Sequence, residues 1–309
     1  MIPRVLSILY SLKCNFFCSH CSVCSTSKHK ELLELKYIQK AIDEAYNIPS
    51  IQVVGFTGGE PTLHPNHLKN SIKYASEHGF IVRLVTNAWW AGNHDKAREF
   101  LEELSSYGLK ELNISYDDFH LEYLSKYGGE RNILNAVKAG VDLGLDVLVG
   151  ITRCKGSRIT SKYIRELLIN ENLYGSVEFI EDFIAPLGRG KNLATLRDER
   201  MYNAGCKDIG FSIPILPDGR ILACCGHILA SEALSILTVG NIKLDTLENI
   251  TKRIHRNVLY WLIHSRGPSY LLERFGENAL HKCEACHKLA LKKERLKSLH
   301  LKKKKYSKN

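Results

Sequence analysis

The sequence has no long uninterrupted apolar run. No stretch approaches the about 20 residues that a membrane-spanning helix needs. The order of a secretory signal peptide is also missing, because Pro3, Arg4 and Ser7 interrupt the apolar start. Extremes of composition are absent too: a hydrophobic share of 44% and a charged share of 25% exclude wholesale disorder, collagen and coiled coil. We therefore expect a globular, cytoplasmic protein with no membrane partner.

The positive charge is concentrated at one end of the chain. The sequence holds 43 Lys and Arg residues against 33 Asp and Glu, a net charge of +10. Residues 282–309 contain ten Lys, one Arg and two Glu, so nine of these ten charge units lie there. We expect residues 291–309 to be a solvated basic tail, with binding of an acidic peptide or a nucleic acid as the alternative. Nucleic acid has little support, because Tyr306 alone among these residues offers an aromatic ring for base stacking.

Ten cysteines are many for a chain in which we expect no export. Disulfides rarely persist inside cells, so metal binding or catalysis is the expected use of these thiols. The cysteines form two groups, and Cys154 stands alone between them as an expected core or rim residue. The first group consists of Cys14, Cys18, Cys21 and Cys24, and the second of Cys206, Cys224, Cys225, Cys283 and Cys286.

Strand-like runs alternate with helical patterns over the first 183 residues. The runs lie at 4–10, 51–57, 81–86, 111–116, 146–152 and 177–183, and the helical patterns at 35–46, 67–78, 97–107, 133–143 and 161–170. Alternation at spacings of about 30 residues predicts right-handed βαβ units and a parallel sheet. Six strands are too few for a closed eight-stranded barrel, so we predict an α/β fold, a partial (β/α)6 barrel. Ligands are then expected at the carboxyl ends of its strands.

The pattern changes after about residue 205. Two short runs, 211–216 and 220–223, flank the turn Pro217-Asp218-Gly219 and predict a β-hairpin, with helices following at 244–265. We therefore predict three parts: the barrel at 1–204, a small cysteine-bearing extension at 205–290 and the basic tail at 291–309.

The first cysteine group directly follows the first predicted strand. Cys14, Cys18 and Cys21 are spaced so that one tight loop can hold three irons of a cubane cluster and leave the fourth iron open. A closed zinc site takes four ligands, and Cys24 could supply the fourth, so zinc stays an alternative. The second predicted strand ends in Phe56-Thr57-Gly58-Gly59-Glu60-Pro61, where two glycines let the backbone approach a ligand closely.

This pair of motifs resembles the radical S-adenosylmethionine (SAM) superfamily. The resemblance implies that the first three cysteines hold a 4Fe–4S cluster whose open iron is chelated by SAM. It also implies that the backbone of the Gly-Gly-Glu segment meets the SAM amino group, and that polar residues at later strand ends complete the pocket. Strand capping is the alternative role for those later residues. The implied SAM-binding residues are His20, Gly58, Gly59, Glu60, Pro61, Thr86, Asn87, Ser115 and Asp117.

His20 stands where the superfamily often has an aromatic residue. Its flat imidazole can still lie against adenine. Two acids and three aromatic residues are expected near the barrel mouth, as peptide contacts or as a solvated rim. They are Asp117, Asp118, Trp89, Trp90 and Phe119.

The second cysteine group resembles the SPASM and twitch extensions of radical SAM enzymes. The resemblance is carried by the run from Pro217 to Cys225, followed by Gly240-Asn241-Ile242. It implies an auxiliary 4Fe–4S cluster. Complete SPASM domains carry seven ligands for two clusters, so five cysteines argue for one cluster and one surplus thiol, with a zinc ribbon as the alternative. The implied ligands are Cys206, Cys224, Cys283 and Cys286.

Short stretches along nearly the whole chain are similar to the YydG-type radical SAM peptide epimerases. They are residues 56–60, 84–90, 114–120, 224–225 and 283–286. The similarity implies a ribosomally made precursor peptide as substrate and an electron donor such as flavodoxin or ferredoxin. A 5′-deoxyadenosyl radical would take the Cα hydrogen of an L-residue, and a thiol on the opposite face would return a hydrogen atom. We assign that thiol to Cys225, with the reverse assignment to Cys224 left open.

Other functions stay open at this point. One is a radical SAM maturase that forms thioether or carbon–carbon cross-links in a peptide. Another, from a different class, is a zinc-bearing nucleic-acid binding protein. A third is radical SAM modification of RNA, for which the basic tail is the sole support.

Overall fold

The computed structural model describes residues 1–173, 175–197, 204–227 and 236–292. The fold is built on one nine-stranded sheet in the order β6-β5-β4-β3-β2-β1-β7-β8-β9. Strands β1 to β7 are parallel, and β8 and β9 are antiparallel to their neighbours. The strands are β1 (Val5–Ser11), β2 (Val53–Gly58), β3 (Ile81–Thr86), β4 (Leu109–Ser115), β5 (Asp146–Arg153), β6 (Val177–Phe183), β7 (Ser212–Ile215), β8 (Arg220–Leu222) and β9 (Thr238–Asn241).

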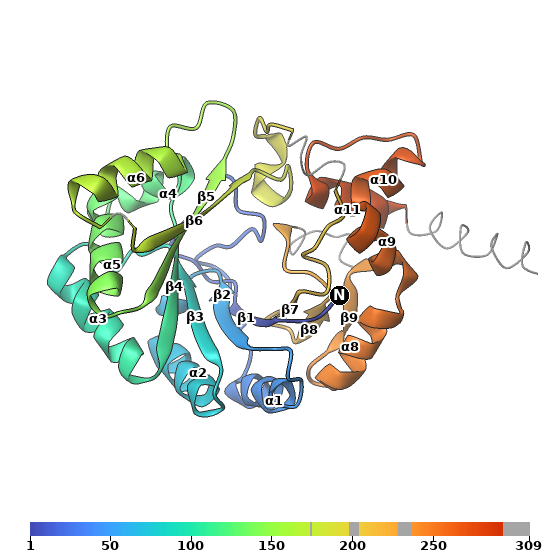
Figure 1. The fold of residues 1–309 in the computed structure, drawn as a ribbon, viewed down its shortest axis with the longest axis horizontal. Helices are drawn as coiled ribbons and strands as arrows, with labels where there is room; N and C mark the ends of the chain where they lie inside the picture. Colours follow the sequence, from blue (N-terminus) through green and yellow to red (C-terminus); the bar gives the residue numbers. More distant parts are fainter. Residues whose placement is uncertain (174, 198–203, 228–235, 293–309) are drawn as a thin grey trace, which may run out of the picture.

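The helices of the βα units lie along the outer side of this sheet, and the later helices gather beyond its other end (Figure 1). The first set comprises α1 (Leu35–Tyr46), α2 (Pro65–Glu77), α3 (His94–Ser106), α5 (Glu130–Asp142) and α6 (Ser161–Asn170), whereas the short elements η1 (Pro61–Leu63), α4 (Asp118–Leu124) and η2 (Gly188–Asn192) belong to the connections that follow β2, β4 and β6. The second set comprises α8 (Leu247–Arg256), α9 (Val258–Arg266), α10 (Pro268–Glu273) and α11 (Lys282–Leu291).

Burial follows the hydrophobic patterns of the sequence. Strand β1 is buried over its whole length, as expected of a strand with neighbours on both edges and helices on one face. Helix α1 buries Ile38, Ala41, Ile42 and Ala45, which recur every three or four residues and so share one helical face. This packing of helices on a parallel sheet thus places the carboxyl ends of the strands along one edge of the sheet.

The structure confirms the predicted partial barrel. In the described part of the chain, β6 and β9 form the two open edges of the sheet, so the barrel does not close. The predicted hairpin is also present, as β7 and β8. Its place in the sheet was not predicted: β7 pairs in parallel with β1, so Val5 lies beside Ser212. The extension therefore continues the barrel sheet.

The domain boundaries at 204/205 and 290/291 stay predictions. Most of the expected basic tail, residues 293–309, lies outside the described residues. None of the helices in the described part of the chain has the length and apolarity that crossing a membrane requires.

Candidate functional site

A cavity of about 440 Å³ lies at the carboxyl ends of the parallel strands. All six barrel strands contribute to its wall, as the strand-end rule predicts. The remaining walls come from the first cysteine loop, from Arg189, from the segment Cys225-Gly226-His227 and from four residues just after β2, β3 and β4, namely Gly59, Asn87, Asp117 and His120. The strand residues are Leu9, Thr57, Gly58, Val85, Thr86, Ser115, Gly150, Ile151, Thr152, Ile180 and Asp182.

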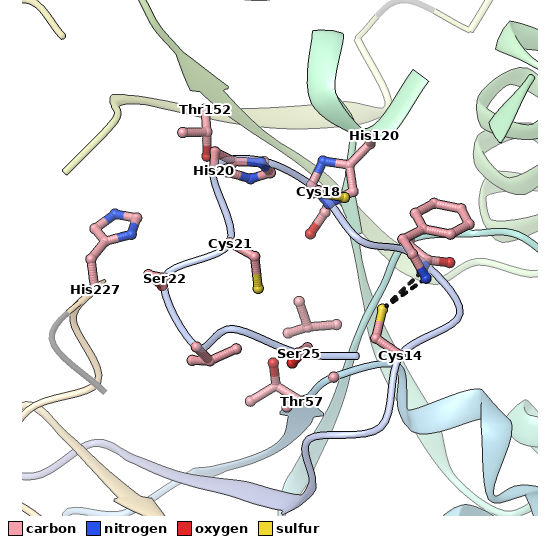
Figure 2. Close-up of a pocket in the computed structure, with 18 of the residues that line it drawn as sticks. Cys14, Cys18, His20, Cys21, Ser22, Ser25, Thr57, His120, Thr152 and His227 are labelled. Carbon is pink, nitrogen blue, oxygen red and sulfur yellow. Dashed lines mark hydrogen bonds between the residues drawn. The ribbon is translucent and has the colours of Figure 1, made fainter. Parts of the chain in front are cut away.

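Cys14, Cys18 and Cys21 border this cavity from one loop that follows β1 (Figure 2). The Cys21 N–H donates to the Cys18 carbonyl at 3.1 Å, which makes the turn tight. Two glycines at the end of β2 let the loop dock. A Cβ on Gly58 would lie 2.3 Å from the Ser11 carbonyl oxygen, and one on Gly59 would lie 2.1 Å from that of Lys13. The Gly-Gly pair is thus required by the close approach of the cysteine loop.

Arg189 secures the loop from the side of the C-terminal half. Its Nε donates to the Cys18 carbonyl at 2.9 Å, and its Nη1 donates to the Ser25 carbonyl at 2.7 Å. The guanidinium carbon also lies 4.0 Å from the ring centre of Phe17. Sequence reasoning missed Arg189, although it follows the predicted strand at 177–183 and the strand-end rule pointed there.

The thiol geometry suits a multi-iron cluster better than a single zinc ion. The sulfurs of Cys14, Cys18 and Cys21 do not all lie within 4.8 Å of one another. Four thiolates around one zinc at about 2.3 Å would be about 3.8 Å apart. Cys24, the possible fourth zinc ligand, does not line the cavity. Burial raises the pKa of the Cys14 thiol to about 12, so a bound metal would have to displace its proton.

Glu60 and Pro61 do not line the cavity, whereas Gly58 and Gly59 do. The buried Glu60 carboxylate accepts four hydrogen bonds, from the Thr62 N–H and hydroxyl, the Thr86 hydroxyl and the Asn87 N–H. Pro61 uses its carbonyl to accept from the Tyr10 hydroxyl. The Glu60 side chain thus braces two strand ends, and only backbone of the Gly-Gly-Glu segment faces the cavity.

Thr86, Asn87, Ser115 and Asp117 all line the cavity, as the resemblance implied. The Asn87 side-chain nitrogen also donates to the Asn15 side-chain oxygen at 3.1 Å and so contacts the cysteine loop. These residues therefore meet the first cysteine group at one site, although up to about 100 residues separate them along the chain.

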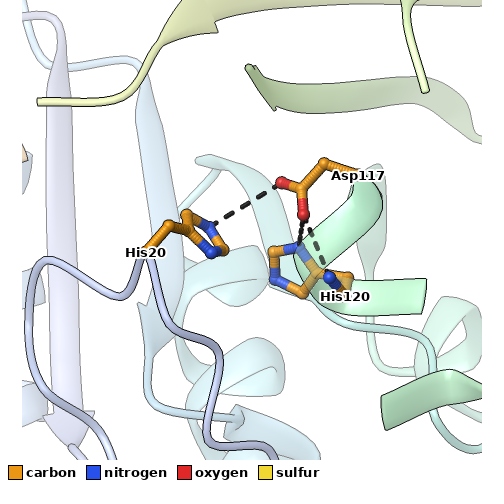
Figure 3. A group of neighbouring side chains, drawn as sticks. All are labelled: His20, Asp117 and His120. Carbon is orange, nitrogen blue, oxygen red and sulfur yellow. Dashed lines mark hydrogen bonds and ion pairs between the residues drawn. The ribbon is translucent and has the colours of Figure 1, made fainter. Parts of the chain in front are cut away.

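Asp117 lies between two histidines, His20 and His120 (Figure 3). One carboxylate oxygen is 2.8 Å from His120 Nδ1, and the other is 3.7 Å from His20 Nε2. Asp117 also caps α4 by accepting from the Phe119 and His120 N–H groups. Burial opposes ionisation of Asp117, yet its contacts with His120 and His20 hold its pKa below the usual range. Burial lowers the pKa of His20 to about 4, so His20 is neutral at pH 7.

The other expected mouth residues brace the rim. Phe119 stacks on His20 at 4.6 Å between ring centres, so one face of that imidazole is covered. The indole N–H of Trp89 donates to Thr62, and that of Trp90 donates to Thr86. Asp118 accepts from two backbone N–H groups of the segment after β5. None of these four residues lines the cavity.

Cys206, Cys224, Cys283 and Cys286 are all buried and gather in the extension. A Cβ on Gly226 would lie 3.1 Å from the Cys283 sulfur and 3.4 Å from the Cys224 sulfur, so these two thiols flank that glycine. Here too, no three described sulfurs lie within 4.8 Å of one another. The donor set fits a cubane cluster better than one zinc ion.

Cys224 and Cys225 face different surroundings although they are adjacent. Cys224 lies close enough to Cys206, Cys283 and Cys286 for their thiols to raise its pKa, whereas Cys225 lines the barrel cavity. Burial raises the pKa of the Cys225 thiol, and the hydroxyls of Ser7 and Ser212 beside it partly offset this rise. Cys225 is therefore a protonated thiol at neutral pH and carries an S–H group next to the cavity.

Sequence reasoning also missed Asp182, His227 and Thr152, which line the cavity, and His281 behind it. Thr152 and Asp182 end their strands, so the strand-end rule could have found them. No local signal indicates His227 or His281, because each depends on a contact with a residue far away in the sequence.

Comparison with known proteins shows the family of the chain. The family model of the radical SAM superfamily matches residues 8–168, more than half of the chain. A Bacillus subtilis protein named "Putative peptide biosynthesis protein YydG" is 24% identical over 283 residues, which span 90% of this chain and 86% of that protein. The GTP 3′,8-cyclase of Campylobacter jejuni is 28% identical over 204 residues, and these span 60% of the cyclase.

Two solved structures share the fold over nearly their whole length. The enzyme anSMEcpe, solved with bound SAM and the peptide Cp18Cys, has a TM-score of 0.59 and 14% identity, and the match covers 94% of this chain and 95% of that one. BtrN, solved with SAM and 2-DOIA, has a TM-score of 0.57 and 12% identity, with 92% of each chain covered. At this identity the likeness shows the fold alone.

Proposed function

Because the chain belongs to the radical SAM superfamily, we propose that it is a peptide epimerase, which converts L-residues of a ribosomally made precursor peptide into D-residues. The family implies SAM and a 4Fe–4S cluster as cofactors, and the relationship to YydG points to peptide biosynthesis. The observation that carries the proposal is the placement of the Cys225 thiol on the cavity wall, next in sequence to Cys224 of the auxiliary cysteine set.

In this proposal Cys14, Cys18 and Cys21 hold the SAM-binding cluster. SAM would be bound in the cavity by the backbone at Gly58 and Gly59 and by the polar residues at the ends of β3 and β4. When bound, the cluster and SAM would supply the 5′-deoxyadenosyl radical chemistry that abstracts the Cα hydrogen of one peptide residue. The buried Asp117 carboxylate orients His20 and His120 beside this space.

Cys225 acts on the opposite face of that carbon. Its S–H bond breaks, a new Cα–H bond forms with inverted configuration, and a thiyl radical is left on Cys225. One electron and one proton restore the thiol. The four cysteines of the extension would hold an auxiliary cluster next to this residue, with flavodoxin or ferredoxin as the external donor. Inversion requires abstraction and return on opposite faces of one carbon, which makes the placement of the thiol decisive.

The test compares Cys225→Ala with Cys154→Ala, a matched loss of a thiol that does not line the cavity. Each reconstituted protein is incubated with a candidate precursor peptide, SAM and reductant. We expect Cys225→Ala to lower D-residue formation by at least about a hundredfold, since the hydrogen donor is removed. In deuterated water the wild-type product should gain one deuterium at Cα without any other change of mass. Undiminished D-residue formation in Cys225→Ala would refute the assignment, and a product lighter by a hydrogen pair would indicate cross-linking instead.

A further inference from the structure

Three residues from separate elements meet beside the cavity, and two of them, Asp182 and His227, line it. Asp182 belongs to β6, His227 follows the Cys224-Cys225-Gly226 segment, and His281 immediately precedes α11, which carries Cys283 and Cys286. Asp182 Oδ2 lies 3.9 Å from His227 Nε2, and Asp182 Oδ1 lies 3.6 Å from His281 Nε2. The two imidazole rings meet edge to face, with centres 5.5 Å apart. We call these three residues the clasp.

The clasp joins the barrel to both functional parts of the extension. Asp182 is fixed by the backbone pairing of β6 with β5, where Asp182 lies beside Thr152. His227 belongs to the segment that carries the proposed hydrogen donor, and His281 precedes the helix that carries two cysteines. These two histidines bring the segment and the helix into contact with β6. One carboxylate therefore contacts the segment with the proposed hydrogen donor and the helix with two proposed cluster ligands.

His281 has a defined orientation. Its Nδ1 accepts a hydrogen bond from the Cys283 N–H at 3.0 Å and so caps the N-terminus of α11. The residue is only 4% exposed, and within the described part of the chain its Nε2 has no hydrogen-bond partner. A buried polar atom without a partner is costly, and the nearest anion is the Asp182 carboxylate. The Nε2 atom is thus aimed at Asp182.

This orientation argues against a metal ion in the clasp. The three ligand atoms lie within 4.8 Å of one another, which a metal site would also show. However, a neutral imidazole whose Nδ1 accepts a hydrogen bond carries its proton on Nε2. A protonated Nε2 has no lone pair for a metal. The same proton can point at Asp182, so an electrostatic contact agrees with the observed hydrogen bond and metal ligation does not.

We propose that Asp182 is a positioning residue that holds the donor segment Cys225-Gly226-His227 and the N-terminus of α11 against the barrel. This inference rests on the proposed function only for its catalytic consequence, because the clasp itself is a structural contact. Its role in the reaction is to keep the Cys225 thiol at a fixed distance and angle from the cavity. Misplacement of a reacting group by about 1 Å can reduce a rate by about a hundredfold.

The variant Asp182→Asn keeps the size of the side chain and removes its charge. We expect amide hydrogen exchange in residues 224–227 and 282–286 to rise by at least about tenfold, because both segments lose an anchor. We also expect the yield of D-residue per 5′-deoxyadenosine to fall by about tenfold, since radicals form without a well-placed donor. Asp182→Glu, which retains the carboxylate, should recover part of that yield.

A second variant separates the clasp from helix capping. His281→Asn retains a good N-cap oxygen for α11 but loses the imidazole that faces Asp182, so it should resemble Asp182→Asn in both measurements. Glu178→Gln is the matched control, because it removes an exposed carboxylate from the same strand, four residues earlier. It should change neither measurement by more than about twofold.

The outcomes separate this inference from the proposed function. Wild-type exchange rates in Asp182→Asn would overturn the clasp, whatever the activity. If amide hydrogen exchange rises as expected in Asp182→Asn but the wild-type protein makes no D-residue, the clasp is supported and the epimerase assignment is refuted. A divalent metal other than iron that copurifies with the wild type and is lost in Asp182→Asn would overturn the clasp in favour of a metal site.

Discussion

At the scale of single residues, buried polar groups near the cavity support one another. Glu60 is 1% exposed, and its two oxygens are fully used by groups at the ends of β2 and β3. Burial raises the pKa of this carboxyl even though hydrogen bonds favour its ionised form. Glu60 thus links the glycine segment to Thr86 and Asn87. Its side chain serves first to hold these segments together and not to take part in the reaction.

Glu60→Gln should therefore destabilise the fold. One carboxylate oxygen becomes an NH2 group that faces either the Asn87 N–H or the Thr62 N–H, so a donor meets a donor. We expect a loss of about 1–3 kcal/mol in the free energy of unfolding, measured by urea denaturation. Glu178→Gln provides the exposed counterpart. Equal stability of the two variants would contradict the bracing role of Glu60.

The positions of individual residues at the cavity were predictable only where a strand end or a family motif marked them. The cysteine loop, Gly58, Gly59, Thr86, Asn87, Ser115 and Asp117 lie where the sequence placed them. Glu60 was expected at the pocket, and its side chain turns away because four donors hold it. His281 could not be found, since its partner Asp182 lies about 100 residues earlier and no periodicity connects them.

At the scale of elements, the docking of the cysteine loop on the end of β2 is the critical contact. The Lys13 carbonyl oxygen lies 2.1 Å from where a Cβ of Gly59 would be. Ordinary carbon–oxygen contacts are longer, so any side chain at position 59 must push the loop away from the strand.

Gly59→Ala should thus displace the loop by about 1 Å and impair cluster assembly. We expect iron bound after reconstitution to fall to less than about half of the wild-type amount at the first site, measured by iron analysis and visible absorption. Gly55→Ala is the control, because a Cβ there meets nothing closer than 3.8 Å on the same strand. Normal iron loading in Gly59→Ala would show that the loop tolerates the shift.

Element boundaries followed the strength of the sequence pattern. The helix 35–46 and the strands 81–86 and 177–183 were predicted to the residue, because each has a clear hydrophobic pattern. Helix α4, with seven residues, was missed since it is too short to show a helical period. Strand β9 was missed as a strand because its four residues are all only half-buried.

At the scale of the whole molecule, barrel and extension share one sheet. Ile213 in β7 is fully buried and pairs with Leu6 in β1. The core that contains Leu6 and Ile213 also contains Ile38 of the first helix and Ile250 of α8. One hydrophobic core thus serves both parts.

Ile213→Ala should therefore weaken the entire fold. Truncation of a fully buried Ile costs about 2–5 kcal/mol, and the loss should appear as one transition, because Ile213 belongs to a core that the barrel and the extension share. Circular dichroism and tryptophan fluorescence during urea denaturation would check this. Two well-separated transitions would show that the extension unfolds independently.

The parallel pairing of β1 with β7 also means that β1 is synthesised long before its partner strand. Val5 lies beside Ser212, so more than 200 residues must be synthesised before that edge of β1 finds its partner. At translation rates of about 5–20 residues per second, the edge waits for roughly 10–40 s. During this interval the first cysteine loop already exists while the thiols of the extension do not. The first cysteine set is therefore synthesised before the second. Cluster delivery to the nascent chain can begin at the first set before the second set is made.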